Sequence, residues 1–213
     1  MATNPMAFQR EALRWEAVRE RESQTGEARL NLIRLCALLV FYAYHLISFY
    51  WLEAGKTTFE FHVQVAALVL AWSSEVVALY YCAFRGWLRH PLVKYASLGW
   101  DVAMISCLLI LCDRPSGAFV MLYLLVIASS VLRLSVALIY FATVASIAGY
   151  LFALGQYVFL DVGYQTYFAT PALRLSRNEQ ILVVLALLTS GFVAGQILRL
   201  VKRAAYNFAV VEN

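Results

Sequence analysis

Residues 30–51 read LNLIRLCALLVFYAYHLISFYW, and this stretch decides the class of fold. Arg34 is its only Lys, Arg, Asp or Glu, and most of the other residues are apolar or aromatic. A bilayer core of about 30 Å takes about 20 such residues in a helix, because each helical residue rises about 1.5 Å. The stretch therefore predicts a transmembrane helix.

The same criterion divides most of the chain into transmembrane stretches. Of the 213 residues, 62% are hydrophobic and 14% are charged, and the mean hydropathy is +0.70, far from the balance of a soluble domain. The period-two alternation of a membrane β-barrel is absent, which leaves helices. We predict an all-α polytopic membrane protein, a bundle of six transmembrane helices preceded by a short amphipathic N-terminal helix. The predicted spans are about 30–51, 59–84, 92–112, 118–133, 135–158 and 179–200.

Charged segments flank the predicted six-helix domain, residues 28–203. Residues 1–27 are predicted to form a cytoplasmic arm and residues 204–213 a cytoplasmic tail. Within the arm, strong helix formers follow Pro5, and Phe8, Ala12 and Trp15 recur at helical spacing. This pattern predicts a helix over 5–24 that lies on the membrane surface or against a partner, with a solvated arm as the alternative. The arm lacks the apolar core and cleavage site of a signal peptide.

Two turns separate the middle spans. Pro115 and Gly117 in DRPSG, residues 113–117, interrupt two apolar runs and predict a tight turn. No glycine or proline divides residues 118–148, so the turn between spans four and five is placed at the polar residues from Ser129 to Ser135.

The orientation follows from the excess of Lys and Arg that cytoplasmic flanks carry. Under the six-span scheme, 13 of the 17 basic residues fall on the side of the two termini and 4 on the other side. Both termini are therefore predicted to be cytoplasmic. The 13 are Arg10, Arg14, Arg19, Arg21, Arg29, Arg34, Arg85, Arg89, Lys94, Arg133, Arg199, Lys202 and Arg203; the 4 are Lys56, Arg114, Arg174 and Arg177.

Four ionisable residues lie inside predicted spans, where an isolated charge is costly. Arg34, Glu75, Asp101 and Arg133 all fall in the cytoplasmic half of their helices, so we expect them to meet and neutralise one another. One interpretation is a structural ion-pair cluster that orders the bundle. The other is a relay for a proton or a signal.

His45 and His62 lie near the outer ends of the first two spans. Two histidines on neighbouring helices are a possible pair of haem ligands, although the two differ in depth by about 4–5 Å at the helical rise. The alternatives are a histidine hydrogen-bonded to Ser48, Tyr42 or Tyr44, or one that lines a pocket for a lipid, a quinone or another small lipophilic ligand. No cofactor and no metal site is expected from the remaining residues.

Gly191 and Gly195 form a G-x-x-x-G pattern in the sixth span, which allows another helix to approach closely. The partner helix is either a neighbour within the bundle or the same helix of a second copy. In the outer loop, residues 159–177, polar and aromatic side chains form the predicted extracytoplasmic contact surface, with a re-entrant or interfacial connector as the alternative. Its candidate residues are Tyr164, Tyr167, Phe168, Arg174 and Arg177.

Several function classes find no support. The phosphate-binding loop, H-E-x-x-H and G-x-S-x-G motifs are absent, so the chain is not expected to be an enzyme. All four prolines lie outside the span centres, which disfavours the broken helices of many transporters. The four cysteines are interpreted as small buried hydrophobic residues, with oxidation near the outer face as the alternative for two, Cys107 and Cys112.

The order of these features resembles the six-helix membrane domains that precede the output domains of bacterial class III adenylate cyclases and some sensor histidine kinases. The likeness spans nearly the whole chain, from LNLIRL in the first span through GWDVA in the third to the final helix. Its matching residues are Arg34, Asp101, Ser116, Gly117, Arg133 and Tyr150. It implies a sensor in the bacterial cytoplasmic membrane that passes a membrane or lipophilic signal through its last helix to a dimeric output domain.

Two functional hypotheses follow. In the first, the chain is a non-catalytic sensor or anchor domain and a homodimer, either part of a receptor or a separate subunit, since no cyclase or kinase sequence follows the last span. In the second, it is an accessory subunit of a larger respiratory or photosynthetic membrane complex that holds lipid, quinone or pigment. Membrane lipids are the expected surroundings in both, and nucleic acid is not an expected partner.

Overall fold

The computed structural model describes residues 5–52, 58–85, 87, 90–112, 115 and 118–211, and all regular structure in these ranges is helical. The predicted all-α class is confirmed. The α-helices are α1 (Pro5–Ile47), α2 (Phe59–Phe84), α3 (Pro91–Leu111), α4 (Met121–Ser130), α5 (Val136–Gln156), α6 (Tyr164–Ala169) and α7 (Arg177–Val211). Two π-helical turns, η1 (Ser48–Leu52) and η5 (Tyr157–Asp161), and three 3₁₀ turns, η3 (Ala118–Val120), η4 (Val131–Arg133) and η6 (Pro171–Leu173), continue or join them.

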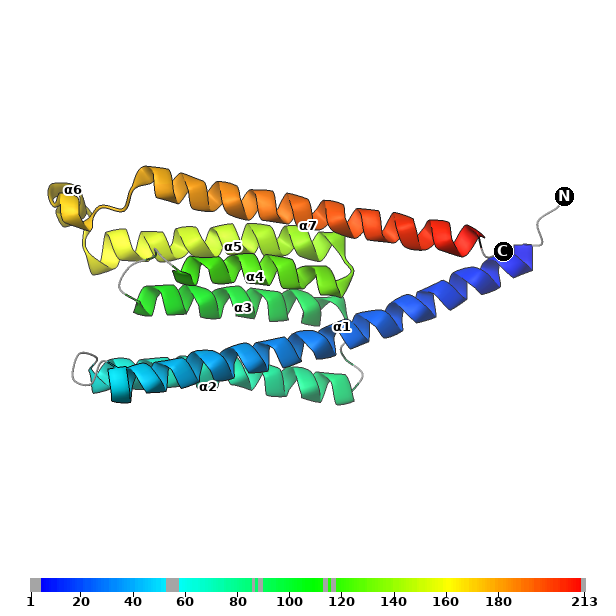
Figure 1. Cartoon of the computed structure of the whole chain (residues 1–213), viewed down its shortest axis with the longest axis horizontal. Coiled ribbons are helices and arrows are strands. Elements are labelled where there is room, and N and C mark those ends of the chain that lie inside the picture. Colours follow the sequence, from blue (N-terminus) through cyan, green and yellow to red (C-terminus); the bar gives the residue numbers. More distant parts are fainter. Residues whose placement is uncertain are drawn as a thin grey trace.

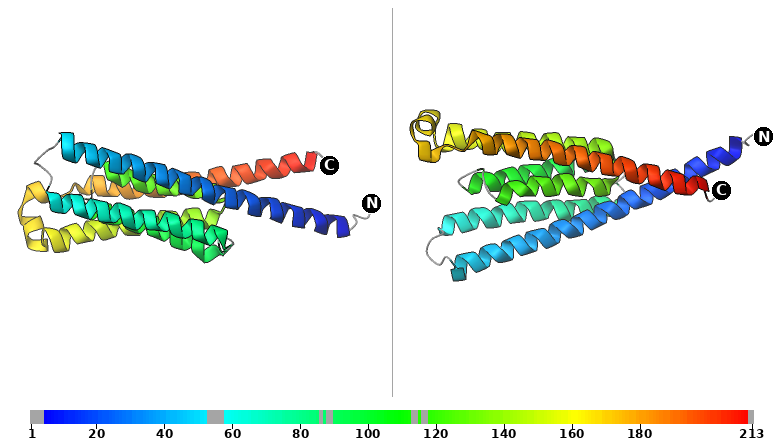
Figure 2. Two further views of the ribbon diagram at one scale, coloured as in Figure 1. Left: turned by 90° about the horizontal axis from the view of Figure 1, so that it is seen from below. Right: turned by 45° about the horizontal axis from the view of Figure 1, so that its top comes forward.

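Helices α1, α2, α3, α4, α5 and α7 lie side by side and alternate in direction, and the short α6 caps one end of the bundle (Figure 1). Helix α3 is central and packs against α2, α4 and α5, while α7 packs against α4 and α5. The α1–α2 hairpin lies at one side of the bundle. Both views in Figure 2 show α1 and α7 running past the other helices at the same end of the bundle.

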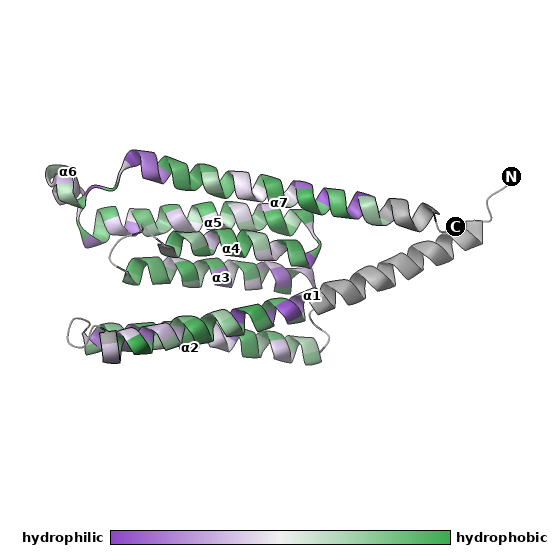
Figure 3. Cartoon of the chain, viewed as in Figure 1, coloured by the Kyte–Doolittle hydropathy of each residue, from purple (hydrophilic) through white to green (hydrophobic). Residues whose placement is uncertain are grey.

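Within the described residues, five segments are long and apolar enough to cross a membrane, which identifies a multi-pass membrane protein. The segment Met121–Arg133, which lies within the fourth predicted span (118–133), is apolar but shorter. Figure 3 shows hydrophobic residues along the helices of the bundle, with hydrophilic residues gathered near the start of α7 and where α1 enters the bundle. The five long segments are Gly26–Trp51, Phe59–Phe84, Pro91–Leu111, Val136–Asp161 and Pro171–Ala205.

The helix boundaries have local causes. The side chain of Thr58 caps α2 by accepting a hydrogen bond from the backbone N–H of Phe61, and Pro91 occupies the first turn of α3. Between α4 and α5, Leu134 adopts a left-handed conformation with φ of 53°, so the chain reverses where the sequence predicts a turn. Several predicted features lie outside the described residues: Ser116 and Gly117 of the DRPSG turn, the loop 53–57, and Arg89 and Arg114.

The N-terminal arm differs from the prediction. No separate surface helix exists over 5–24, because α1 runs unbroken from Pro5 to Ile47. Gly26 is the only helix-weakening residue near the predicted junction, and one interior glycine costs only about 1 kcal/mol relative to alanine, which does not end a helix. The apolar face predicted at Phe8, Ala12 and Trp15 falls on side chains outside the described part.

Candidate functional site

The candidate site is a group of buried polar side chains at the end of the bundle where α1 enters it. Helix α1 contributes Glu27, Asn31 and Arg34, spaced four and three residues apart and hence on one face of the helix. Helices α2 and α3 and the turn η4 supply the others. We call this group the polar cluster: Glu27, Asn31, Arg34, Trp72, Glu75, Ser97, Asp101 and Arg133.

Arg34 is the centre of the polar cluster. Its Nε donates to Oδ2 of Asp101 at 3.0 Å, and one terminal nitrogen, Nη2, donates to the same oxygen. Nη2 also donates to Oγ of Ser97 at 2.8 Å, and Nη1 donates to Oδ1 of Asn31 at 3.0 Å. The guanidinium group thus joins α1 to α3 through a charge-assisted, two-nitrogen contact, which is the strong kind of ion pair.

Helix α2 adds an indole and a second carboxylate. Nε1 of Trp72 donates to Oδ1 of Asp101 at 3.1 Å, so both oxygens of that carboxylate accept hydrogen bonds. Glu75 is 9% exposed, and Nη1 of Arg34 lies 3.6 Å from its Oε1. Neither carboxylate oxygen of Glu75 has a hydrogen-bond partner among the described residues. Glu75 is therefore joined to Arg34 by charge, without a hydrogen bond between the two side chains.

Arg133 links the turn η4 to the other elements. Its Nε lies 3.2 Å from Oε1 of Glu27 on α1, and its Nη2 donates to Oγ of Ser97 on α3 at 2.9 Å. Nη1 donates to the backbone carbonyl of Lys94. Because Arg34 and Arg133 share the hydroxyl group of Ser97, the two ion pairs form one connected network. It pairs opposite charges across α1, α2, α3 and the turn, with three carboxylates around two guanidinium groups, so it can hold these elements in register.

The structure brings all four predicted charged residues together, and it adds residues that the sequence prediction missed. Glu27 was placed in the arm, outside the membrane domain. Asn31 and Ser97 could have been predicted from the sequence. Asn31 lies three residues before Arg34, and Ser97 lies four residues before Asp101, so each shares a helix face with its charged neighbour. Trp72 could not have been predicted, since tryptophan in a span is usually packing.

Gly26 allows the close approach of α1 to the turn. A Cβ at this position would overlap the backbone carbonyl oxygen of Leu132, which a rigid turn cannot move cheaply. We expect Gly26→Ala to push α1 outward, to weaken the pair of Glu27 with Arg133, and to lower the free energy of unfolding by about 1–3 kcal/mol. Reversible unfolding in mixed detergent micelles measures this change.

The matched control is Gly99→Ala on α3, where a Cβ meets no atom within 4 Å. Removing a helical glycine there should stabilise the protein by about 0.5–1 kcal/mol. Equal stabilisation by both substitutions would show that α1 does not depend on the missing side chain at position 26.

His45 and His62 meet near the other end of the α1–α2 hairpin. Nε2 of His45 lies 3.1 Å from Nδ1 of His62, within hydrogen-bonding distance, and the two rings are nearly parallel. Phe49 stacks on His62 with ring centroids 4.5 Å apart. A haem plane does not fit between two imidazoles that are hydrogen-bonded directly to each other. His45 is hydrogen-bonded, but its partner is His62 and not the predicted Ser48, Tyr42 or Tyr44. Among the described residues, no group of three or more His, Cys, Asp or Glu is placed to hold a metal.

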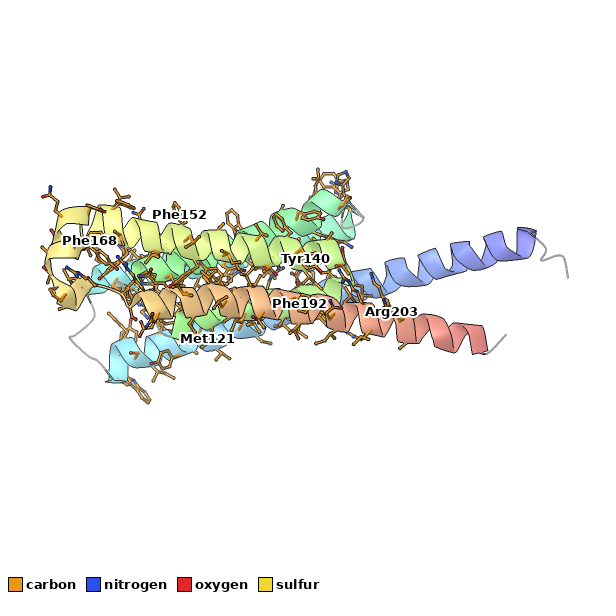
Figure 4. The ribbon with its side chains drawn as sticks, turned by 90° about the horizontal axis from the view of Figure 1, so that it is seen from above. Met121, Tyr140, Phe152, Phe168, Phe192 and Arg203 are labelled. Atoms are coloured by element: carbon orange, nitrogen blue, oxygen red, sulfur yellow. The ribbon has the colours of Figure 1, made fainter. Side chains whose placement is uncertain are left out.

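The G-x-x-x-G pattern packs within the bundle. A Cβ on Gly191 would overlap the side chain of Thr143 on α5, and a Cβ on Gly195 would lie 3.4 Å from the hydroxyl oxygen of Tyr140. Figure 4 shows Tyr140 near the end of α5 closest to the chain termini. The pattern therefore joins α7 to α5 of the same chain, which leaves it buried and unsuited to be the dimer contact.

The outer loop is folded into a cap. The hydroxyl group of Tyr157 donates to the carbonyl of Leu173 at 3.1 Å, and the hydroxyl oxygen of Tyr167 accepts from the N–H of Leu175 at 3.0 Å. Of the predicted contact residues, Tyr167 is thus buried inside the cap. Four remain exposed: Tyr164, Phe168, Arg174, which donates to the carbonyl of Phe168, and Arg177.

The cysteines differ from the prediction of buried packing. Cys36 and Cys107 are exposed, and Cys82 and Cys112 are half-buried. Apolar side chains on the outside of a membrane bundle contact lipid, so burial against protein is not required of them.

Two cavities adjoin α4. The first, of about 100 Å³, lies between α1, α3 and α4 beside Arg34 and Asp101. The second, of about 350 Å³, lies between α4, α5 and α7.

Comparisons of the chain with protein-family models, curated proteins and solved structures gave no match.

Proposed function

We propose that this chain is a non-catalytic membrane sensor or anchor domain, which passes a membrane or lipophilic signal through its last helix to a cytoplasmic partner or output domain. In this proposal all six helices cross the bacterial cytoplasmic membrane and both termini are cytoplasmic. The alternating helix directions, the common end of the two termini and the excess of basic residues at that end support this topology (Figure 1).

The observation that carries the proposal is the place of the polar cluster. It joins α1 to α2, α3 and η4 where α1 leaves the bundle, and α7 leaves at the same end (Figure 2). A change in helix packing inside the membrane would therefore move two projecting helices relative to each other. Packed elements with discrete arrangements are the physical means by which such a signal travels.

The test measures the distance between α1 and α7 in two bilayers. Spin labels replace the exposed residues Arg29 and Arg203 after the four native cysteines are changed to alanine. A sensor of bilayer state is expected to shift this distance by several ångströms between nanodiscs of short-chain and long-chain phosphatidylcholine, because mismatch alters helix tilt. The variant Arg133→Gln should broaden the distribution in both bilayers.

Arg85→Gln is the matched control, since Arg85 is exposed and its side chain bonds to Tyr81 of its own helix. It should leave the distances unchanged. A distance that is the same in both bilayers, in a protein that stays monomeric, would contradict the sensory proposal.

One observation favours the second candidate, an accessory subunit of a larger membrane complex. In the most apolar part of each span, 17% of the residues are buried in α1 and in α2, against 50% in α3, so this hairpin presents the most open surface. Purification from native membranes in a mild detergent distinguishes the two. Stoichiometric co-purification of other subunits would support the accessory role, and an isolated homodimer would support the sensor.

A further inference from the structure

The larger cavity has apolar walls and a polar end. Val120 and Leu124 on the α4 side and Val183 and Leu187 on α7 are among its apolar lining residues. Tyr150, Glu179 and Gln180 supply the polar groups. This combination is typical of a small-molecule site, in which apolar walls hold the body of a ligand and a few polar groups orient it.

Tyr150 is the first group that lacks a partner. The residue is 2% exposed, and its hydroxyl group makes no hydrogen bond to any described residue. A hydroxyl group that lines a cavity without a bond to the protein is available to a ligand or to water inside that cavity.

Glu179 lies in the first turn of α7, where it is exposed and forms the rim of the cavity. Its carboxylate forms no hydrogen bond or ion pair within the described ranges. Among the described residues, no Lys, Arg or His lines the cavity. An ionised carboxylate only accepts hydrogen bonds, so its complement is a donor, and a cationic donor forms the stronger bond.

The smaller cavity lacks this property. Its polar lining residues Arg34, Asp101 and Trp72 are already bonded to one another in the polar cluster. A ligand there would have to break existing bonds, whereas a ligand in the larger cavity would meet the hydroxyl group of Tyr150 and, at the rim, the carboxylate of Glu179, neither of which bonds to another described residue.

We propose that the cavity between α4, α5 and α7 binds a lipophilic amine, whose ammonium group pairs with Glu179 near Tyr150 and whose apolar body lies between α4 and α7. The amine then contacts α7, the last helix, which passes the signal to the partner in the proposed function. The role of the amine as a signal rests on the proposed sensor function. Its binding to the cavity does not depend on that function and is measured separately.

The experiment compares three probes that share an eight-carbon skeleton and differ in the polar head group: octylamine, octanol and octanoate. The full chain is placed in nanodiscs of phosphatidylcholine, a lipid without a primary amine, and apparent dissociation constants come from the rise of the unfolding temperature with probe concentration. Octylamine is expected to bind wild type about two- to fivefold more tightly than octanol, because its ammonium group forms an ion pair with an exposed carboxylate. Octanoate is expected to give no rise.

Glu179→Gln should abolish the preference for octylamine over octanol. Glu60→Gln is the matched control, since Glu60 lies in the first turn of α2 at the same end of the bundle and does not line the cavity. Tyr150→Phe keeps the ring and removes the hydroxyl group, so it should weaken octylamine severalfold even if Glu179→Gln does not fold. Equal binding of octylamine and octanol by wild type, or an unchanged preference in Glu179→Gln, would overturn the proposal.

Discussion

Replacement of Arg34 with methionine is expected to lower the free energy of unfolding by about 3–5 kcal/mol. Arg34 satisfies one oxygen of Asp101 and is the cation nearest to Glu75. Without it, two buried carboxylates face each other with no compensating charge on α1, and a buried charge without its partner is strongly unfavourable. Equilibrium unfolding in mixed micelles of SDS and a non-ionic detergent measures the loss.

Two further variants separate lost charge pairing from lost packing. In the double variant Arg34→Met with Asp101→Leu, both charges of the main pair are gone, so more than half of the loss should be recovered. Recovery stays incomplete because Trp72 loses its acceptor. Arg29→Met, an exposed change on the same helix, should alter the free energy of unfolding by less than about 0.5 kcal/mol. If Arg34→Met costs no more than Arg29→Met, the polar cluster does not stabilise the bundle.

Gly191→Leu is expected to separate α7 from α5 and to cost about 3 kcal/mol, near the upper end for overpacking. Even one added carbon overlaps the side chain of Thr143, which is buried and donates to the carbonyl of Ile139 at 2.9 Å. Thr143 therefore cannot move aside without losing its hydrogen bond. The same unfolding measurement gives the cost.

The controls test the assignment of this contact to a single chain. Gly195→Ala should be tolerated, because its Cβ meets Tyr140 at ordinary contact distance, and Gly155→Ala should be neutral or stabilising, because its Cβ meets no atom within 4 Å. Thr143→Ala should recover part of the loss caused by Gly191→Leu. The oligomeric state should not change in any of these variants. A stable monomer formed by Gly191→Leu from a dimeric wild type would instead place this contact between two copies.

The transmembrane segments could be predicted because hydropathy along the chain is a local property. The second predicted span, residues 59–84, coincides with α2, and the turn after Ser130 was found from polar residues alone. The junction at Gly26 could not be found in this way. Whether a helix continues through a weak position such as Gly26 depends on what packs beside that position. Here the backbone of the turn at Leu132 packs directly against Gly26 of α1.

The candidate site was predictable in part. Charges at similar depth in a bilayer attract one another because each is costly alone, and this argument correctly brought Arg34, Glu75 and Asp101 together. The same argument did not identify Glu27 as the partner of Arg133, because that pair forms only where α1 runs beside the turn η4.

The amino-acid sequence by itself determined that the chain is helical, that it belongs in a membrane and which buried charges must find partners, since each of these follows from transfer free energies along a single segment. Only the tertiary structure decided the partners: Thr143 for Gly191, His62 for His45, and the shared cavity of Tyr150 and Glu179. Apolar helix faces are similar in composition, so hydropathy does not distinguish one neighbour from another. That choice is made by steric fit and by the few polar groups that have to meet.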